Sequence, residues 1–296
     1  MKRLIVQLRK AVVRALEHDV VNTAKAVAYS GMLLFFPAVL VITTLLALVP
    51  EGPTRVGDIR ASVEQFLPPD TMYLLQSYVV TRRIRSFQVI LSASSLSLWA
   101  GMGVMLSLME GFRRAYQLPP DGWGFWSRRL RSLLLVPIAL APLSVATLML
   151  VFGHQIEFWM VNNAQHEMRY VVVVFWRMVR WAVAVLTSLT VLTALYHFGT
   201  RRKEHWFWVG PGAVAGTLIW FPATLIFGWY VSRSSHYSRF YGSFSAGIAT
   251  LVWLYITAFS VLLGAELNGV LYGNRQENHS SRNPDSPAPP PHDSCQ

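Results

Sequence analysis

Six long runs without a charged residue constrain the fold of this chain more than any other feature. Each run has 20 to 28 residues and contains no Asp, Glu, Lys or Arg. The runs are 26–50, 86–109, 132–156, 181–200, 205–232 and 240–265. A helix of about 20 apolar residues crosses the hydrocarbon core of a bilayer. A soluble all-α protein would have to bury six such helices, and only 14% of this chain is charged, against about 25% in soluble domains. The runs therefore predict an all-α, polytopic membrane protein with six transmembrane helices.

The basic residues are distributed unevenly around these spans, and the asymmetry predicts an orientation. Of the 26 Lys and Arg, sixteen lie in 1–25, 110–131, 201–204 and the C-terminal tail, while ten lie in the three segments on the opposite side. Cytoplasmic loops carry such an excess, so we predict cytoplasmic N- and C-termini. The net charge of +11 then reflects topology and attraction to anionic headgroups. Membrane lipids are the expected partners, and no nucleic acid is expected.

Three domains are predicted from this pattern. Apolar residues recur with helical period in 1–25 and basic residues fill the other face, which indicates an amphipathic helix on the inner membrane surface; a helix packed on the protein's own loops is the alternative. The run that follows is too long for the apolar region of a signal peptide. Residues 26–273 form the six-helix membrane domain, with an outer helical cap at 51–85. The proline-rich segment 274–296 is predicted to be a disordered cytoplasmic tail.

Prolines and small residues occur inside several spans. A proline within a helix removes a backbone hydrogen bond and bends the helix. The candidate helix kinks are Pro37, Pro137, Pro142 and Pro222. The run 86–109 is rich in Ser, Ala and Gly, which allows close helix packing in lipid. A polar path along that helix is the alternative interpretation.

Three segments resemble the YihY/BrkB family of bacterial inner-membrane proteins. They are "AVAYSGMLLFFPAVLVI", "GFRRAYQLPPDGWGFWSRRLRSLLL" and the C-terminal stretch from "PGAVAGTLIWFPATLIFGWYVS" to "GAELNGVL". The last is the most specific, with Tyr241-Gly242, Trp253-Leu254-Tyr255 and Gly264-Ala265-Glu266-Leu267-Asn268 in the family's order and spacing. The resemblance covers about residues 10–273 and implies six helices, cytoplasmic termini and a multi-pass location in the bacterial plasma (inner) membrane. It implies no settled activity, because some members carry a ribonuclease BN-like label and others are associated with serum resistance or envelope integrity.

The sequence favours three functions in a clear order. Transport or lipid handling across the cell envelope comes first, since kinked and polar helices at membrane depth often border a path. A non-transporting scaffold, or a partner of a periplasmic protein that docks on 51–85, comes second. A ribonuclease comes last, because the carboxylates are scattered and the eight histidines have no metal-ligand spacing. The single cysteine, Cys295, provides no disulfide framework. We expect no enzymatic activity, no cofactor and no metal.

Glu266 ends the last charge-free run and is the strongest candidate for a functional residue. At ~1.5 Å rise per residue it lies about 34 Å along the last span, near the cytoplasmic edge. A carboxylate at this depth is costly unless it is paired. We predict that Glu266 pairs with Lys25 or Arg113 in an inner gate or a structural clasp, with Asn268 and Tyr29 as secondary polar contacts. The candidate residues are Glu266, Asn268, Lys25, Tyr29, Glu110 and Arg113.

Overall fold

The computed structural model describes residues 2–48, 87–119, 124–142, 169–200, 206–233 and 245–282. Apart from short turns, these residues are helical, so the all-α prediction is confirmed. The helices are α1 (Lys2–Glu17), α2 (Val20–Leu48), α5 (Phe87–Ala115), α7 (Arg169–Gly199), α8 (Trp206–Arg233) and α10 (Ser245–Arg282). A further helical segment covers 125–142.

Five of the described helices are long and apolar enough to cross a membrane. These spans are Val20–Val41, Leu91–Ala115, Val172–Gly199, Trp206–Val231 and Gly247–Arg275. The predicted span 132–156 is helical up to residue 142 and then leaves the described residues. A sixth span therefore stays a prediction. The predicted outer cap at 51–85 also lies outside the described residues.

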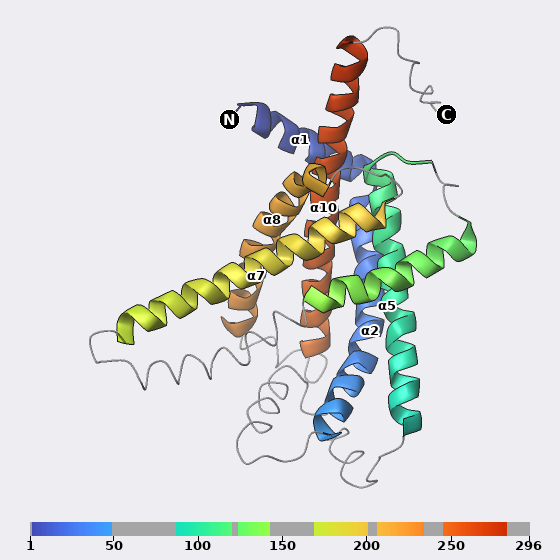
Figure 1. The fold of residues 1–296 in the computed structure, drawn as a ribbon, viewed down its shortest axis with the longest axis vertical. Helices are drawn as coiled ribbons and strands as arrows, with labels where there is room; N and C mark the ends of the chain where they lie inside the picture. The colour runs from blue at the N-terminus through green and yellow to red at the C-terminus, as the bar shows by residue number, and fades with distance from the viewer. Residues whose placement is uncertain are drawn as a thin grey trace.

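Helix α10 is the central element of the fold (Figure 1). It contacts α1, α2, α5 and α8, while α2 also packs along α5 and α7 crosses obliquely against α8. Helices α2 and α8 run in one direction, and α5 and α10 run in the other. We call the end where α1 lies, where α2 and α8 begin and where α5 ends, the α1 end of the molecule. The predicted basic segments 1–25 and 110–131 have their described residues at this end.

A two-residue turn joins α1 to α2. Asp19 has a φ of 58°, in the left-handed region that Asp tolerates better than most residues. Its backbone carbonyl accepts from the Thr23 N–H at 3.1 Å, and its carboxylate accepts from the Asn22 side chain at 2.7 Å. These bonds fix the start of α2 at Val20. The domain boundary predicted after Lys25 therefore falls inside α2.

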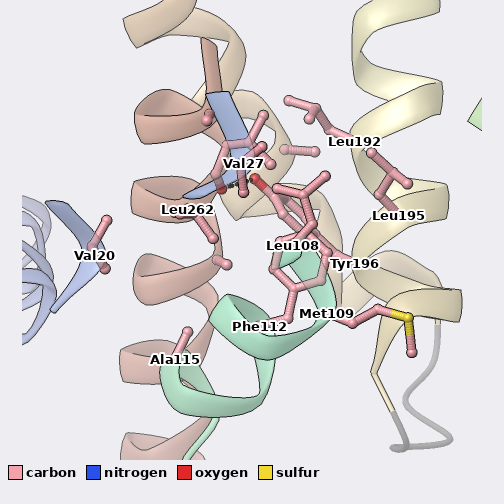
Figure 2. Close-up of a cluster of buried hydrophobic side chains, with 14 of the residues drawn as sticks. Val20, Val27, Leu108, Met109, Phe112, Ala115, Leu192, Leu195, Tyr196 and Leu262 are labelled. Carbon is pink, nitrogen blue, oxygen red and sulfur yellow. Dashed lines mark hydrogen bonds between the residues drawn. The ribbon is translucent and has the colours of Figure 1, made fainter. Parts of the chain in front are cut away.

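The core is concentrated at the α1 end. Figure 2 shows side chains of α2, α5, α7 and α10 meeting around Phe112 and Tyr196. The two rings pack edge to face with their centroids 5.3 Å apart. The Tyr196 hydroxyl donates to the Val261 carbonyl at 2.6 Å, a buried bond between α7 and α10. This bond satisfies a hydroxyl that would otherwise be costly to bury.

Glycines let α8 and α10 approach at backbone distance. A Cβ added at Gly264 would lie 2.5 Å from the Gly212 carbonyl oxygen and 2.5 Å from the Tyr196 hydroxyl. A Cβ at Gly212 would meet the Gly264 carbonyl and the Asn268 side chain. Close packing of small residues stabilises helix pairs in lipid, where apolar burial between helices gives little driving force. Gly212 and Gly264 therefore set the spacing of these two helices.

Gly212→Ala is expected to destabilise the protein by about 1–3 kcal/mol, because the new methyl group forces α8 away from α10. The measurement is the apparent melting temperature of the purified protein in detergent. Gly210→Ala is the matched control on the same helix, since nothing lies within 4 Å of a Cβ at Gly210. Equal melting temperatures for the two variants would contradict the close contact.

Helix α10 continues beyond the predicted membrane domain. It ends at Arg282, so residues 274–282, which the sequence analysis assigned to the disordered tail, are helical in the structure. The Arg275 guanidinium lies 3.5 Å from the centroid of the Trp208 ring. This cation–π contact joins the extension of α10 to the first turn of α8. Residues 283–296 lie outside the described part.

Candidate functional site

The candidate site is built on the stretch of α10 that the other helices surround most closely. Residues 264–270 of α10 are all buried. Gly264, Ala265 and Gly269 are small enough to let neighbouring helices approach; a Cβ at Gly269 would meet the Ala115 carbonyl of α5. Glu266 lies about 31 Å from the start of α10 at ~1.5 Å per residue. This places the carboxylate at the α1 end of the molecule.

Glu266 is paired with His18, a residue 248 positions away in the chain. The His18 Nδ1 atom lies 2.9 Å from Oε1 and 3.1 Å from Oε2 of Glu266. The Glu266 side chain is 0% exposed, and that of His18 is 19% exposed. Burial of a carboxylate costs several kcal/mol unless a partner compensates. Among the described residues His18 is the partner with hydrogen-bond geometry, so it fixes α1 to α10.

The predicted partners of Glu266 bind elsewhere, and this part of the prediction is corrected. Lys25 is exposed and donates to the Asn22 side chain at 3.1 Å. Arg113 donates to the carboxylate of Glu110 and to a backbone carbonyl. The physical reasons are local. Because α2 begins at Val20, Lys25 lies in its second turn on the exposed side, and Glu110 binds Arg113 from three residues away on the same helix.

His18 is not among the predicted partners of Glu266. The sequence contains a signal that points to it. Ala11, Ala15 and His18 have the i, i+4, i+7 spacing of one helix face. Ala11 and Ala15 are buried, and Ala11 packs with Leu267 of α10. A histidine that continues a face of small buried residues is therefore directed toward the same neighbour.

The Asn268 side chain forms its hydrogen bonds with α8, and not with Glu266 as predicted. Its side-chain oxygen accepts from the Gly212 N–H at 2.8 Å, and its side-chain nitrogen donates to the Val209 carbonyl at 3.0 Å. Between these two residues lies Pro211, which has no N–H to donate. Asn268 thus supports the first turns of α8 where the proline interrupts the helical hydrogen bonds. Tyr29, the other predicted secondary contact, is 64% exposed and lies outside the buried site.

Glu110 forms a separate ionic cluster at the α1 end. Its carboxylate accepts from Arg113 at 2.6 Å, from Arg114 at 3.2 Å and from Arg128 at 3.0 Å. Arg128 comes from the helical segment 125–142, so the cluster joins the end of α5 to the start of that segment. The candidate residues therefore belong to different contacts instead of one network around Glu266.

Few of the described residues at the candidate site could act as catalytic groups or metal ligands. The His18 imidazole and the Glu266 carboxylate are joined by a hydrogen bond of 2.9 Å between Nδ1 and Oε1. His, Cys, Asp and Glu nowhere gather in a group of three among the described residues. Helix α2 runs through Pro37, α8 runs through Pro222, and Pro137 and Pro142 lie in 125–142. The kinks at these prolines stay a prediction.

Comparison with known proteins shows the family of this chain. The family model described as "Virulence factor BrkB" matches residues 11–289. The chain is 28% identical to the ribonuclease-like protein YfkH of Bacillus subtilis over 260 residues, which are 88% of this chain and 92% of that protein. No solved structure matches the chain significantly.

Longer relatives match as well. The chain is 25% identical to a UPF0761 membrane protein of Aromatoleum aromaticum, over 84% of this chain and 60% of that protein. It is 25% identical to a UPF0761 membrane protein of Azotobacter vinelandii, over 83% of this chain and 58% of that protein. The chain thus spans about three-fifths of these two relatives. Since the family model matches nearly the whole chain and the described helices are long and apolar, the protein is a membrane protein that belongs to the virulence factor BrkB family, the YihY/BrkB family that the sequence resembles.

Proposed function

We propose that this protein crosses the bacterial inner membrane six times, with both termini in the cytoplasm, and that it transports a substrate or handles lipid across the cell envelope. The basic residues support the orientation. Those of α1 and those around Glu110 lie at the α1 end, and basic segments favour the cytoplasmic side. The apolar run 132–156 supplies the sixth span.

The buried His18–Glu266 pair is the observation that carries this proposal. Glu266 lies inside the span Gly247–Arg275 and is fully buried. Ionisable residues within spans are costly, and they generally mark a functional pathway or switch. The pair joins the amphipathic helix α1 to α10, and Asn268 joins the same turns of α10 to α8. A change at the pair would therefore act on the contact between two spanning helices.

Flux through reconstituted vesicles tests the proposal. Purified protein in proteoliposomes is expected to accelerate the passage of at least one probe among fluorescent phospholipids, protons and potassium ions. Glu266→Gln retains a hydrogen-bond acceptor for His18 and is expected to accumulate normally while losing the flux. Protein-free vesicles are the control. Vesicles that stay silent for every probe would contradict transport, and a Glu266→Gln protein that fails to accumulate would favour a structural clasp.

A scaffold is the second candidate, and one observation favours it. His18, Glu266 and Asn268 all have partners within the protein, as expected of a clasp that only holds helices together. In this case the segment 51–85 is the proposed docking site for a periplasmic protein. Crosslinking in cells is expected to capture a periplasmic partner that is lost when 51–85 is replaced by a Gly/Ser linker of equal length. Crosslinks that survive the replacement would contradict docking there.

Ribonuclease activity is the third candidate and rests on the name of YfkH. A nuclease that uses metal ions needs clustered carboxylates or histidines, and the described residues contain no such group of three. We propose that the protein is not an enzyme. Incubation of the purified protein with a fluorescent RNA is expected to leave the RNA intact, and cleavage that tracks with the protein through purification would overturn this.

A further inference from the structure

The ionic cluster around Glu110 contains more positive than negative charge. Three guanidinium groups surround one carboxylate. Arg113 directs Nε, Nη1 and Nη2 to acceptors in the protein. Within the described residues, Arg114 and Arg128 each direct a single nitrogen to Glu110. Their side chains are 39% and 37% exposed, and a guanidinium has five N–H donors. Both arginines therefore have donors left for a ligand outside the protein.

In the membrane placement proposed above, the two arginines lie at the depth where lipid headgroups begin. Arg114 is in the last turn of the span Leu91–Ala115. Arg128 lies one turn from Phe125 and Trp126, which are 63% and 78% exposed. The Arg129 guanidinium covers the Phe125 ring at 4.4 Å from its centroid. Exposed aromatic residues next to arginines are typical of the boundary between hydrocarbon and headgroups.

We propose that Arg114 and Arg128 bind the phosphate of an anionic phospholipid, with Glu110 holding the two guanidiniums side by side. Arginine matches phosphate oxygens with two parallel hydrogen bonds. The excess positive charge favours a headgroup without its own cation, such as phosphatidylglycerol, over phosphatidylcholine. The exposed aromatic side chains give the acyl chains an apolar surface, which free phosphate would not use. This inference rests on the membrane placement in the proposed function and not on transport, since a scaffold would bind lipid equally well.

Lipid binding to the purified, delipidated full-length protein tests the site. Native mass spectrometry would follow dioleoyl phosphatidylglycerol, with dioleoyl phosphatidylcholine as the neutral comparison. Each basic residue near an anionic headgroup contributes about fivefold to binding. Arg114→Gln with Arg128→Gln is therefore expected to weaken phosphatidylglycerol binding about 30-fold. Arg113 still pairs Glu110 in this variant. The matched control, Arg177→Gln with Arg233→Gln, removes the same charge from exposed positions on α7 and α8 and is expected to bind as the wild type does.

Several outcomes would overturn the site. An equal loss in the control with Arg177 and Arg233 changed would show that binding follows net charge alone. Equal binding of the two lipids would remove the anionic selectivity. Displacement of the lipid by millimolar inorganic phosphate would assign the arginines to a soluble anion, and displacement by a short RNA would assign them to RNA.

A second measurement needs no variant. In hydrogen exchange on the wild-type protein, phosphatidylglycerol is expected to protect amides in 110–118 and 124–130, and protection confined to other segments would contradict the site. Flux is measured separately, so a failure of lipid binding at these arginines leaves the transport proposal standing, and silent vesicles leave the lipid site standing.

Discussion

His18→Ala is expected to lower the stability of the folded protein by about 3–5 kcal/mol, because it leaves the Glu266 carboxylate buried without its partner. Such a loss is a large fraction of the stability of most proteins, so the variant should accumulate poorly and melt well below the wild type. The readouts are protein level in the membrane fraction and the apparent melting temperature in detergent.

A double variant separates the lost partner from the lost packing. His18→Ala with Glu266→Met removes the carboxylate and keeps a side chain of similar length, so no buried charge remains. This double variant is expected to recover much of the stability that His18→Ala loses. His18→Gln retains a hydrogen-bond donor for Glu266, and its stability is expected to lie between that of His18→Ala and that of the double variant. A His18→Ala protein that melts with the wild type would contradict the pairing, and a double variant as unstable as His18→Ala would show that packing is what was lost.

Five of the six charge-free runs coincide with described helices that are long and apolar enough to cross a membrane, as expected because the lipid interior excludes charge. Charge-free runs locate the apolar part of each helix, but they do not mark where a helix ends. Helix α2 begins six residues before its run, since Asn22 and Lys25 lie at the exposed start of the helix where polar groups cost little. Helix α10 continues 17 residues past its run. Helical hydrogen bonds continue in water as well as in lipid, so composition misses both extensions.

The position of Glu266 along the last span could be estimated by counting residues, because the rise per residue of a helix is fixed. Its partner could not be found in this way. Arg113 carries the opposite charge and was predicted to pair with Glu266. Glu110, however, is three residues away on the same helix and binds Arg113 instead. The partner found in the structure depends on how α1 lies against α10, a contact between the two ends of the chain. The helical spacing of Ala11, Ala15 and His18 identifies His18 as the partner only once the buried face of α1 is known.

Asn268→Ala is expected to destabilise the protein by about 2–4 kcal/mol, because it leaves the buried Gly212 N–H and Val209 carbonyl without the side chain that binds both. The loss should be local: amides at 208–214 are expected to exchange faster, while those of α1 keep their protection. Asn22→Ala, at an exposed asparagine, is the control and should change stability by less than about 0.5 kcal/mol. Unchanged exchange at 208–214 in Asn268→Ala would contradict the bracing of α8.

Combining His18→Ala with Asn268→Ala distinguishes a clasp from a gate. The two residues act on opposite sides of the same turns of α10, His18 through α1 and Asn268 through α8. If each contact only holds its own pair of helices, the two destabilisations add within about 0.5 kcal/mol. If α1 and α8 respond to each other through α10, as a gate requires, the combined effect departs from the sum by more than this. The coupling is measured by comparing the melting temperature of the double variant with those of the two single variants. An additive result would leave the buried pair as a structural clasp between the two ends of the chain.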